Sequence, residues 1–540
     1  MRSVISVVLS ITLLIGFINP VPVYADEYIR DIEFYADCLK ILGLMQGTDK
    51  GYEPDRSPTR AESAVMLVRL LGKEKTALEE QYTHPFTDVP GWAAPYIGFL
   101  YREGLTKGIG ENRFGSVLLT TPLQYAAFLL RALGYSEEEG DFSYFDALKK
   151  LESVGVLNRT EREAFEKSES FTRKELILLS YRALWSRMKD EKSRLADRLV
   201  STGAVNELCI LALGDGLLPD IKTVNGTYYV QSKEQLDKLI LRALYRYTET
   251  LVINPSEYSG NIREDVSESL KTNDSYTGMY KGADFRWLED REGNIIRYEI
   301  HIKYTVSPEE RKELLKKACR IVADLVKPGM TDVEKELAVH DYLVLNTSYG
   351  YSEHCYDAYG ALIEKEAVCQ GYSRAMLLLL SLAGVYCREV VGTDQGTSHS
   401  WNMVRLDGEY YHVDATYDDP VGAKSVLRHY YFNVTDKDLE KYRLWDRSAY
   451  PVCDQDRYNY YNLNGTYLQN RTEMLEHMKN AFAKGERSFS YRLKDYNPND
   501  FTSEGMKALI RELSEKINGN IVSYSWAPYD RMGVVHITLQ

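Results

Sequence analysis

Internal repetition constrains the fold of this chain more than any other feature. The string Asn-Gly-Thr-Tyr at residues 225–228 recurs at residues 464–467, and a helical pattern in the same register follows each copy. Each copy ends in a strand that alternates in polarity, at residues 296–302 and 534–539. The repetition predicts two small α+β modules around a middle section. We interpret them as scaffold or substrate-positioning domains, because neither carries a set of reactive side chains.

A different repeat fills the N-terminal third of the chain. Its fullest copy has Phe-Thr-Asp-Val at residues 86–89 and Gly-Leu-Thr-Lys-Gly at residues 104–108, which indicates a helix, a Gly-ended turn and a second helix. Two other copies contain Thr-Arg-Ala-Glu at residues 59–62 and Thr-Arg-Lys-Glu at residues 172–175. Thr followed three residues later by Glu forms a capping box at a helix N-terminus. The pattern therefore predicts three helical repeats.

These strings resemble S-layer homology (SLH) repeats, in three copies over residues 28–186. In that family three repeats form a helical prong that binds a secondary cell-wall polysaccharide, often pyruvylated, on Gram-positive-type bacteria. The resemblance implies that Arg60 and Arg173 bind this polymer, because a planar guanidinium can donate two hydrogen bonds to a carboxylate. The second copy has Thr-Pro-Leu-Gln at residues 121–124 instead, so one groove could be inactive. Helical hairpins that only space another domain from the wall are the alternative.

The first 25 residues have the parts of a secretory signal peptide. Met1-Arg2 opens a short basic region, residues 4–18 are almost wholly apolar, and Val23 and Ala25 stand at the −3 and −1 positions of a cleavage site. The apolar stretch is short for a membrane anchor, and no later segment has the length of a span. We expect a secreted chain, held on the cell wall or cell surface, that keeps no stable membrane span after cleavage.

Composition excludes several classes of protein. A formal charge of −13 lacks the basic footprint of a nucleic-acid-binding protein. With 44% apolar residues, the chain is also unlike an intrinsically disordered one. Seven cysteines are too few for a disulfide scaffold, and their odd number leaves at least one thiol unpaired within the chain. An unpaired thiol raises the question of a nucleophile.

One cysteine stands at the start of a strongly apolar helical pattern. Beyond Cys369, good helix formers continue to Leu382, and Gly384 predicts the helix end. In a first turn, unpaired N–H groups and the helix dipole stabilise a thiolate and lower the pKa of the thiol. The position favours a nucleophile, although a lone cysteine is more often a core residue.

A second string supplies partners for that thiol. Asp407-Gly408 is a strong two-residue turn signal, so the strands on either side of it should pair as a hairpin. In this register Trp401 faces Asp414, and His399 lies two residues along on the same face. His399 and Asp414 are then within reach of a hydrogen bond. Together with Cys369 they form a nucleophile, a base and a carboxylate that orients the base.

This stretch resembles the transglutaminase-like fold of the papain-type cysteine enzymes, in its bacterial secreted branch. The catalytic Cys, His and Asp of the family fall on Cys369, His399 and Asp414. The chain also matches the family at His340-Asp341-Tyr342-Leu343, at residues 357–362, at Trp401-Asn402, at residues 417–420 and at residues 430–434.

The resemblance implies a mechanism. A Cys369 thiolate attacks an amide carbon and forms a thioester, His399 protonates the departing amine, and Asp414 holds the tautomer of His399. The backbone N–H of Cys369 and the Tyr359 hydroxyl would stabilise the oxyanion. Resolution by water would make a protease or deamidase, and resolution by a Lys amine would make a cross-linking transglutaminase. The sequence leaves this choice open.

We expect a protein or peptide substrate and neither a cofactor nor a metal. His340, Asp341, His354 and Cys355 match no zinc-ligand spacing, and Asp418-Asp419 lacks the full calcium-loop spacing. Whether Cys355 pairs with another cysteine stays open. The alternative function is a wall-bound structural or binding protein whose transglutaminase-like domain is catalytically idle. The intact triad favours the enzyme.

The predicted fold class is multidomain. All-α SLH repeats precede an α+β, papain-like transglutaminase core, which two small α+β modules flank. The predicted boundaries are a signal peptide at 1–25, three SLH repeats at 26–190, a helical connector at 191–224, a small α+β module at 225–330, the transglutaminase-like domain at 331–463 and a second small module at 464–540.

Overall fold

The computed structural model of the chain describes residues 31–168, 170–190, 193–214, 221–419, 427–517, 519 and 521–539. The predicted signal peptide lies outside these residues. The chain divides into two compact units, one of residues 1–36 and 47–195, the other of residues 37–46 and 196–540. Among the described helices, none is long and apolar enough to cross a membrane.

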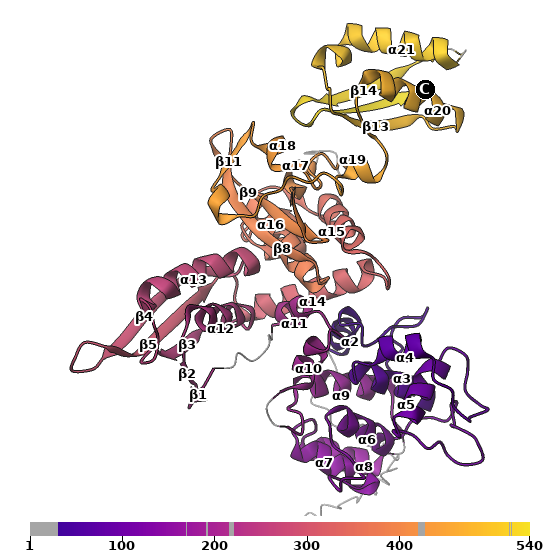
Figure 1. The fold of residues 1–540 in the computed structure, drawn as a ribbon, viewed down its shortest axis with the longest axis vertical. Coiled ribbons are helices and arrows are strands. Elements are labelled where there is room, and N and C mark those ends of the chain that lie inside the picture. Colours follow the sequence, from indigo (N-terminus) through magenta and orange to yellow (C-terminus); the bar gives the residue numbers. More distant parts are fainter. Residues whose placement is uncertain are drawn as a thin grey trace, which may run out of the picture. The chain divides into compact units, whose positions relative to one another are not determined.

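The regular elements that lie within the first unit are all helices (Figure 1). They are α3 (Arg60–Leu70), α4 (Glu74–Glu80), α5 (Ala94–Arg102), α6 (Pro122–Ala132), η1 (Tyr144–Asp146), α7 (Ala147–Ser153), α8 (Arg159–Lys167) and α9 (Arg173–Trp185), while α2 (Ile32–Ile41) spans both units. The capping boxes predicted at residues 59–62 and 172–175 are confirmed. The second copy also has one, between Thr121 and Gln124. Gln replaces Glu there because its amide oxygen accepts the same backbone hydrogen bond.

The two predicted α+β modules are confirmed, and they share one topology. In each, a helix joins two parallel strands, a second helix follows, and an antiparallel hairpin completes the sheet. The strand orders are β1-β2-β3-β5-β4 and β12-β13-β15-β14. The first module comprises β1 (Thr223–Val224), β2 (Thr227–Tyr229), α12 (Lys233–Tyr245), β3 (Thr250–Asn254), α13 (Ile262–Thr277), β4 (Tyr280–Glu289) and β5 (Ile295–Tyr304). The second comprises β12 (Tyr467–Leu468), α20 (Arg471–Ala483), β13 (Ser488–Leu493), η4 (Pro498–Phe501), α21 (Ser503–Ile517), β14 (Tyr524–Tyr529), η5 (Asp530–Met532) and β15 (Val534–Leu539). Each module has its own apolar core.

Between the modules lies a core built on a four-stranded antiparallel sheet, in the order β10-β9-β8-β11. Its strands are β8 (Tyr386–Asp394), β9 (Thr397–Leu406), β10 (Glu409–Val413) and β11 (Arg443–Trp445). Helix α16 (Cys369–Leu382) packs on β8 and β9 (Figure 1), and every residue from Gly371 to Leu382 is buried. A helix that is apolar all round needs such a central position.

Other elements enclose α16 or connect the core. They are α10 (Leu195–Ser201), α11 (Glu207–Ala212), α14 (Pro308–Leu325), α15 (Asp332–Asn346), β6 (Ser348–Tyr349), the π-turn η2 (Gly360–Glu364), β7 (Glu366–Ala367), α17 (Ala415–Asp418), α18 (Asp436–Leu439), η3 (Arg447–Ala449) and α19 (Tyr460–Leu463). Helix α14 falls within the predicted first module but packs on α16.

The predicted hairpin is confirmed in its register. Leu406 pairs with Glu409 around the turn, and the pairing continues to Asn402 and Val413. Both turn residues, Asp407 and Gly408, have positive φ (49° and 88°). This is the backbone that a two-residue type I′ turn requires, and Asp-Gly adopts it readily. The turn therefore sets which residues of β9 and β10 share a face.

Candidate active site

The predicted nucleophile lies at the start of the central helix of the core. Helix α16 begins at Cys369, after Val368 in extended backbone. The N–H of Val368 donates to the carbonyl oxygen of Cys355 (3.0 Å). Gly371 fits this turn because a Cβ there would stand 2.4 Å from the same carbonyl oxygen. The Cys369 thiol is half-buried, among first-turn N–H groups that have no partner within the helix.

The predicted base and its orienting carboxylate are hydrogen-bonded. His399 Nε2 lies 2.7 Å from Asp414 Oδ2, and both side chains are buried. Asp414 is also the N-cap residue of α17, where its Oδ1 accepts from the N–H groups of Thr416 and Tyr417 (3.0 and 3.2 Å). One oxygen is therefore fixed by a helix cap and the other faces the imidazole.

Electrostatics favour an ionised thiol beside a protonated imidazole. Burial raises the pKa of Cys369, but the hydrogen bond and charge of His399, with hydrogen bonds from Ser400, outweigh it and lower that pKa. Burial lowers the pKa of His399, but Asp414 and Cys369 outweigh it and raise the pKa to about 9. Because Asp414 engages Nε2, Nδ1 is the imidazole nitrogen left for the thiol. This arrangement suits nucleophilic attack followed by proton transfer.

A second histidine supports the first through Trp401. The ring of Trp401 stacks on His399, with centroids 5.8 Å apart. Its indole N–H donates to His412 Nδ1 (3.0 Å), so a neutral His412 carries its proton on Nε2, which lies 2.8 Å from Asp436. Burial lowers the pKa of His412, which favours this neutral form. His412 therefore holds the indole that stacks on the base.

The residue expected to stabilise the oxyanion points elsewhere. The Tyr359 hydroxyl donates to Glu313 on α14 (2.7 Å), and its ring lies beside His354. The hydrogen bond to Glu313 is the main cause that raises the pKa of Tyr359 to about 12. A hydroxyl has one proton to donate, so in this conformation Tyr359 has none for an oxyanion. The structure brings Cys369, His399 and Asp414 together, but it does not bring Tyr359 to them.

Comparisons with known families agree with this architecture. A model of the transglutaminase-like superfamily matches residues 320–415, which include Cys369, His399 and Asp414. Residues 320–415 are a transglutaminase-like core. A model of the S-layer homology domain matches residues 85–115, within the second of the three predicted repeats. The chain therefore joins an SLH domain to a transglutaminase-like core.

Similar proteins come from bacterial cell surfaces. A cell surface protein of Thermoanaerobacter kivui is 25% identical over 359 residues, which are 64% of this chain and 44% of that protein. The middle cell wall protein of Brevibacillus brevis is 33% identical over 108 residues, 19% of this chain and 10% of that protein. This chain thus spans less than half the length of either relative. A crystal structure of a TGase covers 33% of this chain and 53% of its own, at 13% identity and a TM-score of 0.19.

Sequence analysis missed a second tyrosine of the transglutaminase-like core. The parallel strands β6 and β7 pair Tyr349 with Ala367, two residues before Cys369. Burial, and then the charge of Cys369, raise the pKa of Tyr349 to about 12, so its hydroxyl lies within electrostatic reach of the thiol. The side chain is 44% exposed. No local motif distinguishes Tyr349, because the pairing of β6 with β7 places it.

The analysis also missed a buried arginine. Arg443 Nη2 lies 2.6 Å from Asp414 Oδ2, the oxygen that faces His399. Burial raises the pKa of Asp414, but the charges of His399 and Arg443 outweigh it and hold that pKa well below its usual range. Arg443 therefore keeps the carboxylate ionised.

Three groups of side chains in the described residues could hold a cation. Within each group, the possible ligand atoms lie within 4.8 Å of one another. The groups are His340, Asp341 and His429; His412, Asp436 and Cys453; and Glu353, His354 and Glu364. Of the four residues weighed as a zinc cluster from the sequence, His340 and Asp341 belong to the first group, His354 belongs to the third, and Cys355 belongs to none of them. All seven cysteines are free, and Cys355 is buried.

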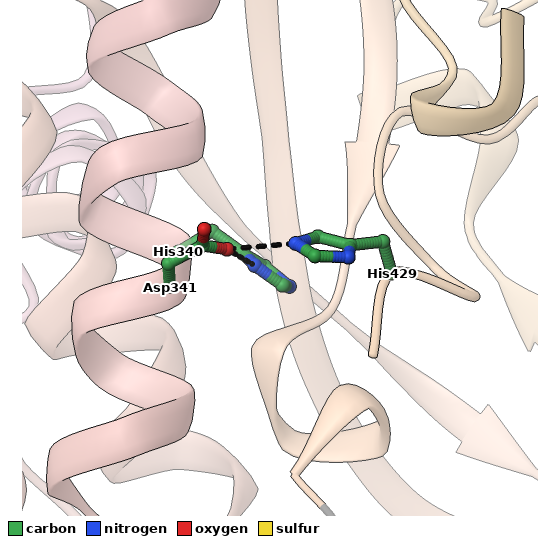
Figure 2. Close-up of side chains that lie close together, drawn as sticks. All are labelled: His340, Asp341 and His429. Atoms are coloured by element: carbon green, nitrogen blue, oxygen red, sulfur yellow. Dashed lines mark hydrogen bonds and ion pairs between the residues drawn. The ribbon is translucent and has the colours of Figure 1, made fainter. Parts of the chain in front are cut away.

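The first of these groups already has internal partners (Figure 2). His340 is fully buried, with Nδ1 3.1 Å from Asp341 and Nε2 3.1 Å from Asp418. Burial lowers the pKa of His340, but the two carboxylates outweigh it and raise the pKa to about 9. Asp341 also meets His429 Nε2 at 2.8 Å. A protonated His340 thus ties α15 to α17, the helix that Asp414 caps.

The two arginines expected to bind the wall polymer differ in the structure. Arg60 lines a cavity of about 640 Å³, together with Lys107 and Arg131. Its Nε donates to the carbonyl oxygen of Phe114 (3.0 Å), and its guanidinium lies over that ring. Arg60 therefore combines an anchored Nε with access to a cavity.

Arg173 is held more tightly. Its Nε donates to the carbonyl oxygen of Tyr52 (2.8 Å), its Nη1 lies 3.4 Å from Glu62, and only 7% of its side chain is exposed. Arg173 is absent from the lining of the cavity beside Arg60. The two arginines occupy equivalent positions in their repeats, but Arg60 lines a cavity whereas Arg173 is buried in an ion pair with Glu62.

Proposed function

We propose that this chain is a cell-wall-associated cysteine acyl-transfer enzyme of transglutaminase-like type that acts on peptide or side-chain amides. The observation that supports this best is the 2.7 Å contact between His399 and Asp414 beside a thiol of lowered pKa. Cys369 is the proposed nucleophile, His399 the acid and base, and Asp414 the residue that orients His399.

In the proposed reaction the Cys369 sulfur forms a bond to the amide carbon. The carbonyl π electrons move to oxygen, and the resulting oxyanion accepts from the backbone N–H of Cys369 at the start of α16. Tyr359, the second donor expected from the sequence, would act there only after leaving Glu313. The C–N bond then breaks, His399 gives its proton to the leaving amine, and a thioester remains. Water or a second amine resolves the thioester, with His399 accepting the proton of the attacking group.

The proposed location is the cell wall, after secretion through the signal peptide at residues 1–25. Relatives described as a cell surface protein, a middle cell wall protein and a surface layer protein support this placement. The cavity beside Arg60 is our proposed site for the wall polysaccharide, because the Arg60 guanidinium can pair with a carboxylate of the polymer. Lys107 and Arg131 line the same cavity but already lie beside Glu138 and Glu137. Arg173 does not line this cavity, and it would bind the polymer only after leaving Glu62. We retain the domain boundaries predicted from the sequence as part of this proposal, except that α14, which they place in the first module, packs on α16 of the core.

The test uses the full secreted chain and its Cys369→Ala variant on isolated wall peptides and surface proteins. Mass spectrometry distinguishes peptide cleavage, conversion of Gln to Glu, and a Gln–Lys isopeptide. We expect one of these products from the native chain and none from Cys369→Ala. Cys355→Ala is the matched control, because it removes a buried thiol of the same core. If the native chain and Cys369→Ala give identical spectra, the idle structural domain is the better description.

A further inference from the structure

The carboxylate that orients the base has a second charged partner, and that partner is deeply buried. Arg443 stands on β11, directly opposite Asp394 on β8. Its Nη2 reaches Asp414 (2.6 Å), and its Nε donates to Asp394 Oδ2 (3.1 Å). Only 1% of the Arg443 side chain is exposed. The guanidinium thus bridges two buried carboxylates.

Aromatic rings enclose the same guanidinium. Its central carbon lies 4.9, 4.8 and 4.8 Å from the ring centroids of Trp401, Tyr417 and Tyr431. Arg443 Nη1 is buried with no hydrogen-bond partner among the described residues. Contacts with three ring faces offset part of that cost. Such an enclosure leaves the arginine little freedom to turn away from Asp414.

The chain of charges continues into the second α+β module. Arg531 lies on η5, in the turn between β14 and β15, and its Nη2 lies 2.7 and 3.0 Å from the two oxygens of Asp394. Next to it, Met532 and Val534 belong to an apolar cluster that also contains Trp401. The module therefore meets the core through both charge and apolar packing.

We propose that Arg443 is a positioning residue of the active site and that the second α+β module, through Arg531 and Asp394, holds Arg443 in place. This inference rests on the proposed function, because it concerns the same site. It gives the module a role in the reaction beyond that of a spacer.

The physical reason lies in the alternation of charge. Arg531, Asp394, Arg443 and Asp414 alternate in charge, so each buried carboxylate has a cation beside it that offsets the cost of burial. Asp414 can then accept from His399 without competing for its proton. Loss of Arg443 would leave two buried carboxylates without their shared cation, and Asp414 would be free to turn. The other titratable groups that face these four charges are Tyr417, Tyr431, Tyr442, Tyr529, His399 and His412.

The experiment measures the rate at which iodoacetamide alkylates Cys369 in the full chain as a function of pH, with the labelled peptide quantified by mass spectrometry. This readout needs no substrate. Where a thiolate–imidazolium pair exists, the rate has a plateau between the pKa of Cys369 and that of His399. Asp414 is the main cause that raises the pKa of His399. We therefore expect Arg443→Met, which frees Asp414 to turn away from His399, to move the upper limit of the plateau to lower pH, while Arg443→Lys keeps the charge and leaves that limit in place.

Turnover is measured on the same variants, with the isolated wall peptides and surface proteins of the product screen as the amide substrates. Misplacement of a catalytic group by about 1 Å can cost roughly 100-fold, so we expect Arg443→Met to lose about 10- to 100-fold in kcat. Arg531→Gln should lose less in kcat, because Arg531 contacts Asp394 and reaches Asp414 only through Arg443. Arg487→Gln is the control, because this arginine of the second module is exposed and contacts neither Asp394 nor Asp414.

Separate outcomes overturn the two proposals. A native chain whose Cys369 is alkylated like a free thiol at every pH contradicts the proposed function. A native plateau that Arg443→Met leaves unchanged contradicts the positioning role, and an Arg531→Gln variant that matches Arg487→Gln contradicts the role of the module. If Arg443→Met does not fold, Asp394→Asn tests the same chain without emptying the space that Arg443 fills, and unchanged turnover in that variant overturns the inference.

Discussion

The two α+β modules share one topology but contact the transglutaminase-like core through different parts. The first module uses its second helix: α13 packs on β8 and α16, and Asp274 on that helix lies 3.3 Å from Arg374. The second uses its terminal hairpin, where the η5 turn carries Arg531 to Asp394. In the first module the equivalent hairpin exposes Trp287 and Leu288 to solvent, at 47% and 56%.

Two modules of the same fold can therefore have different roles in one protein. A helix face that packs on α16 can stabilise the nucleophile's helix without meeting the reacting groups. A hairpin turn that reaches β8 and β11 contacts the residues behind Asp414. Mutations in the first module should therefore lower mainly the stability of the chain, whereas mutations in the second module should lower mainly its catalytic rate.

Apolar packing of the two hairpins gives the largest contrast. Met532 is 4% exposed in a cluster with core residues, whereas Leu288 on the first hairpin is 56% exposed. We expect Met532→Ala to lower the free energy of unfolding by about 2–4 kcal/mol through the cavity it leaves. Leu288→Ala should change it by less than about 0.5 kcal/mol. Urea unfolding followed by tryptophan fluorescence measures both, and equal effects would show that the hairpins are used alike.

The acidic contacts give the next largest contrast. Asp394→Asn weakens the bonds to both Arg443 and Arg531, so we expect turnover to fall about 10-fold or more. Asp274→Asn weakens the contact with Arg374 and the hydrogen bonds that Asp274 accepts from Thr277 and Tyr280, so it should reduce stability with little change in kcat. Steady-state kinetics beside thermal unfolding separates the two. A kcat that falls equally in both variants would mean that the modules position the site together.

Local patterns account for what the sequence predicted. The Asp407-Gly408 turn sets the register of its own hairpin, and the helix start at Cys369 depends on adjacent residues. Arg443 and Asp414 are 29 residues apart, and Arg531 and Asp394 are 137 apart, so only the assembled sheet and module bring them together. The hydrogen bond from Tyr359 to Glu313 could not be predicted for the same reason, because Glu313 stands 46 residues earlier on another helix. No spacing rule covers such pairs.

A matched pair of histidines gives the smallest contrast. His536 on β15 pairs with Ser490 on β13, and His301 on β5 pairs with Thr250 on β3, which are equivalent positions in the two sheets. The His536 ring lies 5.4 Å from Tyr430 of the core. Burial, followed by the charges of Arg428 and His429, lowers the pKa of His536 to about 4.

The folded chain therefore binds fewer protons at this site than the unfolded chain between pH 4 and 6.5. The contribution of His536 is full above about pH 6.5 and is lost as the pH falls through 4. Partial exposure reduces its size to about 1–2 kcal/mol. We expect His536→Gln to flatten the rise of unfolding free energy between pH 4 and 6.5, and His301→Gln is measured beside it as the comparison variant of the first module. A native slope in His536→Gln would mean that the ring stays solvated, and that the second module contacts the core less closely than Arg531 and Met532 indicate.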